Sequence, residues 1–413
     1  MSRRSSKVYN TIVAHFGQYL RKILLRDSRT TAMSKMLSLV GLLCVSLAVV
    51  NAQLDITSRT DLKFVFLVHR HGDSTPVPST LIFSDEPEEV TKDVAKYGWN
   101  QLINLGKLRS YRLGEFIRSN YNTFLSAKYN ESEVYIRSTD SARAKMSILT
   151  ALAAIYPPPT PSWNTKINWD PVPYTTVEAK YDFNFATVNC PAFEKIYKGL
   201  FNTSVPSMNQ YSDLLTTLSP LVNFDLVSFP AQIYGVYELF QSLLSLGVTF
   251  NPDILDVFPQ IEEAAGVAVD HVMGNDQYIN LQAGTFLEEF FKYADKTIQG
   301  QKTPRMRIYS GDDFNVYSLQ AVTRVTERQG IPKYSSLYAL ELRKVRSTGE
   351  YVVVPMYLPE PGSGVKQLEI QDCGALCDYE TFRNITNDYV LDTPTWRSKC
   401  GWTQNIHIDS TEI

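Results

Sequence analysis

Three short polar segments of the chain carry residue types suited to chemistry on an anion. The first, Arg70–Pro76, reads Arg-His-Gly-Asp-Ser-Thr-Pro, so that a histidine stands beside an arginine. The second is Arg137–Asp140, with Arg143 one helical turn on, and the third is Gly311–Asp313. A guanidinium binds phosphate oxygens through a planar fork, a histidine can attack phosphorus, and a carboxyl group can protonate a leaving alcohol. The segments together predict an anion site with a nucleophile.

Each polar segment follows a predicted β-strand. Residues 62–68, 133–137 and 305–309 are rich in β-branched and aromatic residues or alternate in polarity, which is typical of strands. Helical periodicity follows each strand, over residues 99–121, 141–155 and 316–326, with a further helix over 286–298. Strand–loop–helix units in succession predict an α/β fold. In such a sheet the loops at the carboxyl ends of the strands converge on one crevice.

The segment between these units has a different composition. Prolines and polar turns separate short helical pieces, so we interpret residues 157–273 as a mostly helical cap insertion. The prediction therefore has four parts: residues 1–52 as a leader, 53–156 as the first part of the α/β core, 157–273 as the cap, and 274–413 as the second part of the core. Residues 337–342 and 351–356 are expected to form a terminal pair of strands.

The charge is distributed unevenly along the 413 residues. Eight Lys and Arg residues against one Asp give residues 1–35 a charge of +7, which leaves −10 for the remainder of a chain with net charge −3. An acidic body is a poor candidate for nucleic-acid binding. Residues 37–50 are uncharged and mostly apolar, and they end at Val50-Asn51-Ala52, which is typical of a signal peptide cleaved before Gln53. Residues 1–32 are either a transit peptide or precede the true start at Met33 or Met36. The polar C-terminal tail predicts no membrane anchor.

Cysteines and glycosylation sequons favour secretion, with the lysosomal lumen as the alternative. Beyond the leader, four cysteines remain, which allow three connectivities. Cys373 and Cys377 enclose three residues and could close a tight loop, which would leave Cys190 to pair with Cys400; a zinc site would need tighter spacing. The glycosylation acceptors of the sequence are Asn130, Asn202 and Asn384.

The segments between Leu62 and Cys400 resemble those of the histidine acid phosphatase family, above all its insect venom, prostatic and lysosomal members. The resemblance is strongest over 70–76, 98–121, 135–147, 309–311 and 331–342, and it includes Cys373 and Cys377. It implies an α/β three-layer sandwich with a mixed, mostly parallel sheet. It also implies hydrolysis of small phosphomonoesters through a phosphohistidine without metal or other cofactor, and a homodimer.

The resemblance also assigns roles to residues. His71 resembles the nucleophile, Arg70 and Arg137 resemble phosphate-binding arginines, and Asp313 resembles the general acid. Two positions depart from the family pattern. Ser74 stands where the family has a second arginine of the first motif, and Asp312 stands where it has a histidine.

These two departures predict a weakened site. The pocket loses a positive charge and a donor and gains a carboxylate, whose pKa we expect Asp313 to raise. Removal of one transition-state donor costs about 10²–10³ in rate, so impaired turnover is the first hypothesis. The second is a non-catalytic secreted binding protein that keeps the fold. A third is a divalent metal held by His71, Asp312 and Asp313.

Overall fold

The computed structural model describes residues 56–402, except residues 185 and 277. From Ile56 onward the chain forms one compact unit. The predicted leader over residues 1–52 and the end of the C-terminal tail lie outside the described residues and stay predictions. None of the helices within the described residues has the length and hydropathy of a membrane span.

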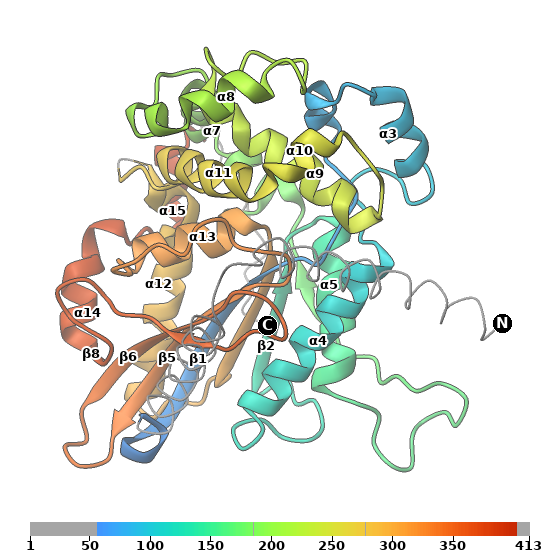
Figure 1. The fold of residues 1–413 in the computed structure, drawn as a ribbon. Helices are drawn as coiled ribbons and strands as arrows, with labels where there is room; N and C mark the ends of the chain where they lie inside the picture. The colour runs from blue at the N-terminus through green and yellow to red at the C-terminus, as the bar shows by residue number, and fades with distance from the viewer. Residues whose placement is uncertain (1–55, 185, 277, 403–413) are drawn as a thin grey trace, which may run out of the picture. The chain divides into compact units, whose positions relative to one another are not determined.

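A mixed β-sheet forms the centre of the fold (Figure 1). Its strands are β1 (Thr60–Arg70), β2 (Val134–Ser138), β3 (Thr175–Thr176), β4 (Met306–Gly311), β5 (Leu337–Val345), β6 (Tyr351–Leu358), β7 (Lys366–Gln367) and β8 (Cys377–Asp378). They lie in the order β3-β2-β4-β1-β5-β6-β7, with β8 paired to β6. The pairs β2–β3, β2–β4 and β1–β4 are parallel, and the pairs β1–β5 and β5–β6 are antiparallel.

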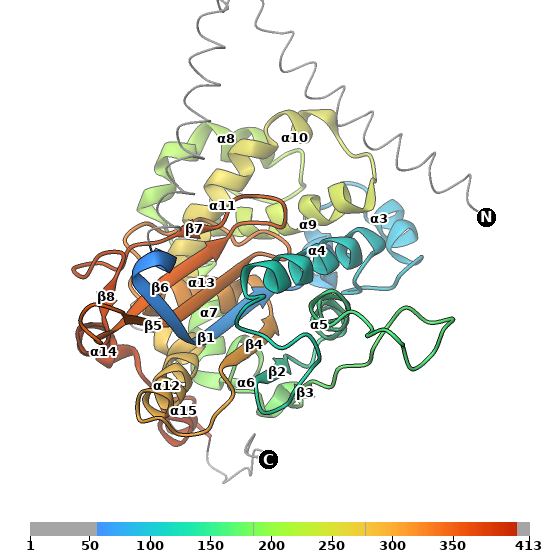
Figure 2. The same cartoon turned by 90° about the horizontal axis from the view of Figure 1, so that it is seen from below.

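Helices cover both faces of the sheet because β1 is apolar on both faces. Phe64, Phe66 and Val68 are buried against α12 (Ile279–Ile298) and α13 (Asp313–Val322). The alternate residues of β1 are buried against α4 (Asn104–Asn120) and α5 (Ala142–Ile155). Successive side chains of a strand point to opposite faces, so a strand that is apolar throughout needs a helical layer on each side. Figure 2 shows the two layers with the sheet between them, and the predicted fold class is confirmed.

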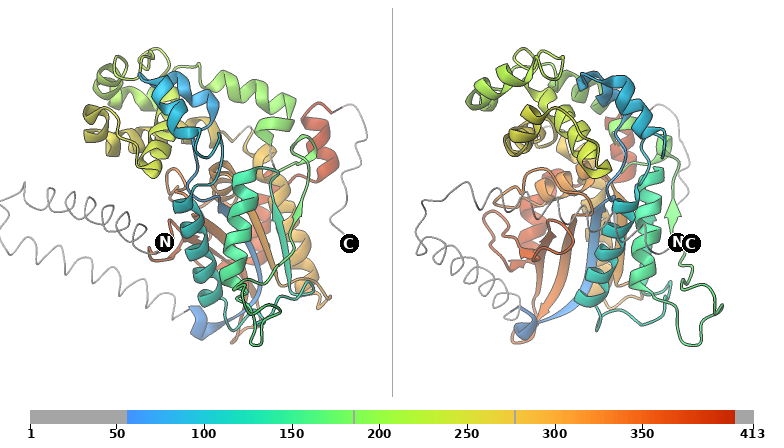
Figure 3. Two further views of the ribbon diagram at one scale, coloured as in Figure 1. Left: turned by 90° about the vertical axis from the view of Figure 1, so that its right-hand side faces the viewer. Right: turned by 45° about the vertical axis from the view of Figure 1, so that its right-hand side comes forward.

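A group of helices lies over the carboxyl ends of β1, β2 and β4 (Figure 3). We name this group the cap, and it consists of η1 (Pro78–Phe83), α3 (Pro87–Val94), α7 (Pro191–Leu200), η3 (Pro206–Tyr211), α8 (Ser212–Leu218), η4 (Pro230–Gln232), α9 (Ile233–Leu246), α10 (Pro252–Asp256) and α11 (Phe258–Met273). The remaining elements are η2 (Ala179–Tyr181), α6 (Ala186–Asn189), α14 (Tyr379–Thr386), η5 (Asn387–Tyr389) and α15 (Thr393–Lys399).

The cap differs from the predicted insertion at its boundaries. Phe83, Val90 and Val94 belong to the same buried cluster as α9 and α11, so η1 and α3 join the cap although they were assigned to the core. At the other boundary, β3 extends the sheet beside β2, although it lies within the predicted insertion. Both differences arise because the partners of these short segments are distant in sequence: apolar side chains of α9 and α11 for η1 and α3, and the backbone of β2 for β3.

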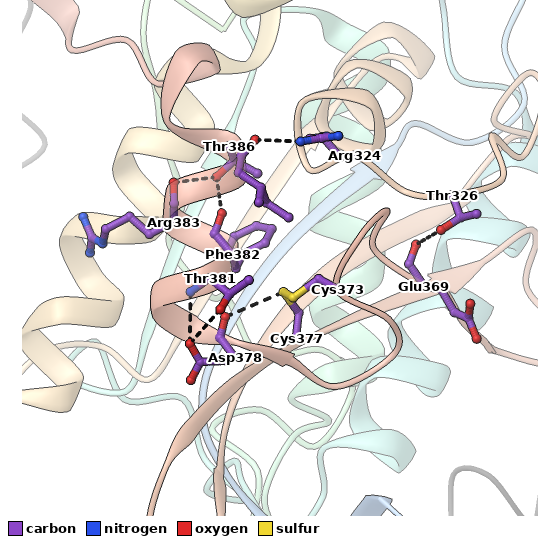
Figure 4. The surroundings of a disulfide bond; sticks show 11 residues. Arg324, Thr326, Glu369, Cys373, Cys377, Asp378, Thr381, Phe382, Arg383 and Thr386 are labelled. Atoms are coloured by element: carbon purple, nitrogen blue, oxygen red, sulfur yellow. Dashed lines mark hydrogen bonds between the residues drawn. A yellow bond between two sulfur atoms is a disulfide. The ribbon is translucent and has the colours of Figure 1, made fainter.

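Two disulfides cross-link the chain between Cys190 and Cys400 and between Cys373 and Cys377. Cys190 pairs with Cys400, which joins the start of α7 to the end of α15, and Cys373 pairs with Cys377. The latter bond lies directly before α14, where the Asp378 side chain accepts a hydrogen bond from the Thr381 backbone N–H at 3.0 Å (Figure 4). The structure therefore contains the pairing that tight closure between Cys373 and Cys377 predicts.

Candidate active site

The three polar segments meet at the carboxyl end of the sheet. β1 and β4 are in register at Arg70 and Gly311, and β2 pairs with β4 one residue earlier, at Ser138 and Ser310. The backbone N–H of His71 continues the pairing by donating to the Gly311 carbonyl oxygen at 2.9 Å. The loops that carry the candidate residues are thus extensions of neighbouring strands.

The loop after β1 lies closely against α4 and α5. The Gly72 backbone N–H donates to the Ser147 hydroxyl oxygen at 2.9 Å. A Cβ atom at Gly72 would lie 2.3 Å from the carbonyl oxygen of Gly106 on α4, a distance at which atoms overlap. Glycine is therefore required at this position because the backbone of the loop contacts the backbone of the helix.

His71 is buried, and its hydrogen bonding orients the ring. Nδ1 lies 2.7 Å from the Gly72 carbonyl oxygen, which can only accept, so Nδ1 carries the proton in the neutral ring. The lone pair is then on Nε2, the atom suited to attack. Burial lowers the pKa of His71, as does the Arg143 guanidinium, against an opposing effect of Asp312. The neutral, nucleophilic form is favoured.

Asp312 occupies the space in front of that nitrogen. Its Oδ1 lies 3.3 Å from Nε2 of His71 and 2.7 Å from Nη2 of Arg143. Burial opposes ionisation, but Arg143 and His71 outweigh it and hold the pKa of Asp312 well below its ordinary value. The expectation that Asp313 raises the pKa of Asp312 is therefore wrong, because the Asp312 carboxylate faces the Arg143 guanidinium.

Asp313 and Arg70 form a second charged pair in the site. Nη2 of Arg70 lies 3.4 Å from Oδ2 of Asp313, and the Tyr234 hydroxyl of α9 donates to the same oxygen at 3.0 Å. Arg70 is 1% exposed, and its guanidinium lies over the Tyr334 ring, 4.3 Å from the centroid. Nη2 of Arg70 also lies 2.9 Å from Oε1 of Glu238.

The two arginines of the second segment lie in different places. Arg143, at the start of α5, contacts Asp312 as described. Arg137 on β2 lies on the same face of the sheet as Tyr309, its register partner, and its Nη2 is 2.6 Å from Oδ1 of the buried Asp182. The structure therefore brings Arg143 to His71 and directs the guanidinium of Arg137 to Asp182.

Ser74 and Asp73 complete the first loop. Ser74 is buried and pairs through its backbone with Leu102, and its side chain supplies no charge. The Asp73 carboxylate accepts a hydrogen bond from the Ser245 hydroxyl of α9 at 2.8 Å and lies 3.0 Å from Nε of Arg109. Asp73 thus links the loop to the cap and to α4.

A metal site would require several acidic, cysteine or histidine side chains to lie around one point. Over residues 56–402, leaving aside 185 and 277, no group of three or more His, Cys, Asp or Glu side chains is arranged to hold a metal ion. His71, Asp312 and Asp313 do not form such a group, because Asp313 faces Arg70.

The chain is similar in sequence to known proteins over most of its length. Residues 61–222 match the family described as "Histidine phosphatase superfamily (branch 2)". Prostatic acid phosphatase of Mus musculus is 29% identical over 92% of this chain and 97% of its own length. Lysosomal acid phosphatase of Xenopus laevis is 26% identical over 91% of this chain and 87% of its own length. Venom acid phosphatase Acph-1 of Apis mellifera is 27% identical over 80% of this chain and 86% of its own length. The histidine acid phosphatase family predicted from the sequence is confirmed.

Solved structures support the fold. A phytase of Klebsiella sp ASR1 is similar with a TM-score of 0.59, over 81% of this chain and 97% of that chain, at 12% sequence identity. A phytase of Citrobacter braakii is similar with a TM-score of 0.57, over 82% of this chain and 99% of that chain, also at 12% sequence identity. The chain shares their fold.

Proposed function

We propose that the chain hydrolyses phosphomonoesters through a phosphohistidine at His71. Nε2 attacks phosphorus, the bond to the ester oxygen breaks, and Asp313 gives its proton to the leaving alcohol. Water then attacks the phosphohistidine, Asp313 takes up a proton, and inorganic phosphate leaves. The observation that carries this proposal is the convergence of His71, Arg143 and the Arg70–Asp313 pair at the ends of adjacent strands.

The geometry modifies the proposed phosphate-binding set. Arg70 and Arg137 were assigned from the family resemblance, but the Arg137 guanidinium is paired with Asp182. Arg143 lies beside His71 and is therefore the better second arginine of this proposal. The position of Ser74 contributes no third positive charge to the site.

Turnover in this proposal is reduced by Ser74 and Asp312. Loss of one transition-state donor costs about 10²–10³ in rate, and two such losses cost roughly 10⁴–10⁶ unless they act as a unit. Acidification gives little relief at Asp312, because its lowered pKa keeps the carboxylate ionised. Measurable hydrolysis is still expected, since enzymes accelerate phosphomonoester hydrolysis by up to ~10²¹.

One observation favours the alternative, a non-catalytic binding protein. The Asp312 carboxylate is the partner of both Nε2 of His71 and Arg143, so the attacking atom and an anion-binding group are already occupied. In this alternative, the fold and the cap serve to bind a ligand or partner, and binding survives the substitution His71→Ala.

The setting of the protein belongs to the same proposal. We place it in the secretory pathway, secreted or in the lysosomal lumen, as a glycoprotein that acts on a small phosphomonoester without a cofactor and forms a homodimer. The asparagines of the three sequons, Asn130, Asn202 and Asn384, are exposed, as glycosylation requires. The two disulfides support an oxidising compartment.

Hydrolysis of p-nitrophenyl phosphate at acidic pH tests the proposed chemistry. The wild type is expected to be faster than His71→Ala, while the control His271→Ala, a histidine of α11 that contacts Thr203, keeps the wild-type rate. The double variant Ser74→Arg with Asp312→His is expected to gain about 10²-fold or more. Equal rates for wild type and His71→Ala, with no gain in the double variant, would favour the non-catalytic alternative.

A further inference from the structure

Both terminal nitrogens of Arg70 have partners within the chain, whereas Nε has no hydrogen-bond partner among the described residues. Nη1 donates to the Pro332 carbonyl oxygen at 2.8 Å, and Nη2 contacts Glu238 and Asp313 at 2.9 and 3.4 Å. The Tyr334 ring covers one face of the guanidinium. Of the two carboxylates that contact Arg70, Glu238 is the one supplied by the cap.

Glu238 belongs to a row of polar side chains along α9. The spacing of one helical face is followed by Tyr234, Glu238, Gln241 and Ser245. Tyr234 forms a hydrogen bond with Asp313, and Ser245 forms one with Asp73. Glu238 and Gln241 both accept hydrogen bonds from Arg70. Most apolar side chains of α9, such as Leu239 and Leu243, are buried in the cap. The polar face of this amphipathic helix is therefore directed at the candidate active site.

A carboxylate and a phosphate have the same requirements for a guanidinium. Both accept charge-assisted hydrogen bonds from the planar fork, so they compete for its nitrogens. We propose that Glu238 is a further functional residue of this site, a built-in carboxylate that competes with a substrate phosphate for Arg70. The inference rests on the proposed function in one respect, the binding of phosphate by Arg70.

The competition is expected to weaken in acid. Burial raises the pKa of Glu238, and the charge of Asp313 acts in the same direction, while Arg70 and Arg143 oppose it. The tyrosines that interact electrostatically with Glu238 are Tyr234 and Tyr237 on its own helix, Tyr197 on α7 and Tyr334 on the loop before β5. Once Glu238 takes up a proton, it no longer competes as an anion. Asp312 behaves differently because its pKa is lowered.

Binding of inorganic sulfate to the full chain, measured by calorimetry, tests this competition. Sulfate is a tetrahedral dianion that does not titrate in this range, so a change in its affinity reports on the protein. From about pH 7 to about pH 5 the wild type is expected to bind sulfate more tightly. Glu238→Gln is expected to bind about tenfold more tightly than the wild type at pH 7 and to lose most of the pH dependence.

The chain offers a matched control in Glu289. This residue of α12 is paired with the buried Arg307 on the sheet, another glutamate–arginine pair away from His71. Glu289→Gln is expected to leave sulfate affinity and its pH dependence unchanged. Thermal unfolding of each variant verifies that it is folded, and Glu238→Ala replaces Glu238→Gln if the latter is not.

The outcomes separate this inference from the proposed function. Unchanged or weaker sulfate binding in folded Glu238 variants, or a pH dependence equal to that of the wild type, overturns the competition. Hydrolysis of p-nitrophenyl phosphate is measured on the same samples. Tighter sulfate binding without hydrolysis in any variant supports the competition and contradicts the phosphatase proposal.

Discussion

Nε2 of His71, the atom proposed to attack phosphorus, lies 3.3 Å from Oδ1 of Asp312. The neutral imidazole therefore presents its lone pair to a carboxylate oxygen. If Nε2 is protonated, it forms an ion pair with Asp312 and is no longer a nucleophile. Either state hinders attack, so the carboxylate at this position reduces reactivity by its location as well as by its charge.

Substitution of Asp312 by asparagine keeps the size of the side chain and removes its charge. Asp312→Asn is expected to raise kcat/KM for p-nitrophenyl phosphate about 10- to 100-fold, since Arg143 becomes available to phosphate. Asp182→Asn is the control, because it removes the carboxylate paired with Arg137 instead. An equal gain in both variants, or none in Asp312→Asn, would contradict this role of Asp312.

Arg143 and Arg137 are expected to respond differently to removal. Arg143→Ala is expected to weaken sulfate binding about tenfold or more and to cost less stability than loss of Arg137, because Asp312 keeps His71 as a second partner. Arg137→Ala leaves the buried Asp182 unpaired, which costs about 3–5 kcal/mol of unfolding free energy. Urea unfolding and calorimetry of both variants measure the two effects. Loss of sulfate binding in folded Arg137→Ala alone would restore Arg137 as the anion-binding arginine.

His69 gives the fold a specific sensitivity to acid. Burial lowers its pKa from 6.5 to about 4, so the unfolded chain binds a proton between these values and the folded chain does not. The stability contributed by the neutral ring is complete above pH 6.5 and falls by about 3 kcal/mol as the pH drops to about 4. Urea unfolding at both pH values is expected to show a smaller loss in His69→Gln. The same loss in wild type and variant would mean that other groups control the acid transition.

The two disulfides are expected to differ in their contribution to stability. The Cys190–Cys400 bond joins residues 210 positions apart, whereas Cys373–Cys377 spans 4. A cross-link restricts the unfolded chain more when it closes a longer loop, so Cys400→Ala is expected to lose about 2–5 kcal/mol of unfolding free energy. Cys377→Ala is expected to lose less. Thermal and urea unfolding compare the two, and an equal loss would contradict the loop-closure explanation.

The sequence was sufficient to predict the fold class and the location of the site. β1 and β4 have continuous apolar runs that end in polar segments, and both features are local in sequence. The boundaries of the cap could not be predicted in the same way. Phe83 and Val90 are buried in a cluster that includes α9, and that contact joins residues about 150 positions apart.

Within the site, the sequence predicted residue types better than partners. The family resemblance assigned phosphate binding to Arg137 and gave Arg143 no role, because the sequence does not reveal that Arg137 lies on the face of β2 that directs it to Asp182. The pKa of Asp312 was predicted from its neighbour in the chain, whereas its spatial neighbours determine it. The sequence analysis missed Glu238, and the one signal that could have found it is the helical spacing of Tyr234, Glu238, Gln241 and Ser245 on a mostly apolar helix.

The path of the chain between His71 and α4 constrains how a ligand enters. Only seven positions after His71, the chain enters the cap at Pro78, and it returns from α3 to α4, whose backbone touches the His71 loop. Any displacement of η1 and α3 is therefore expected to change the conformation of the loop that carries His71. Movement of the cap as a rigid body would therefore distort the site. Ligand exchange is expected to proceed by rotation of side chains such as Glu238, with the cap in place.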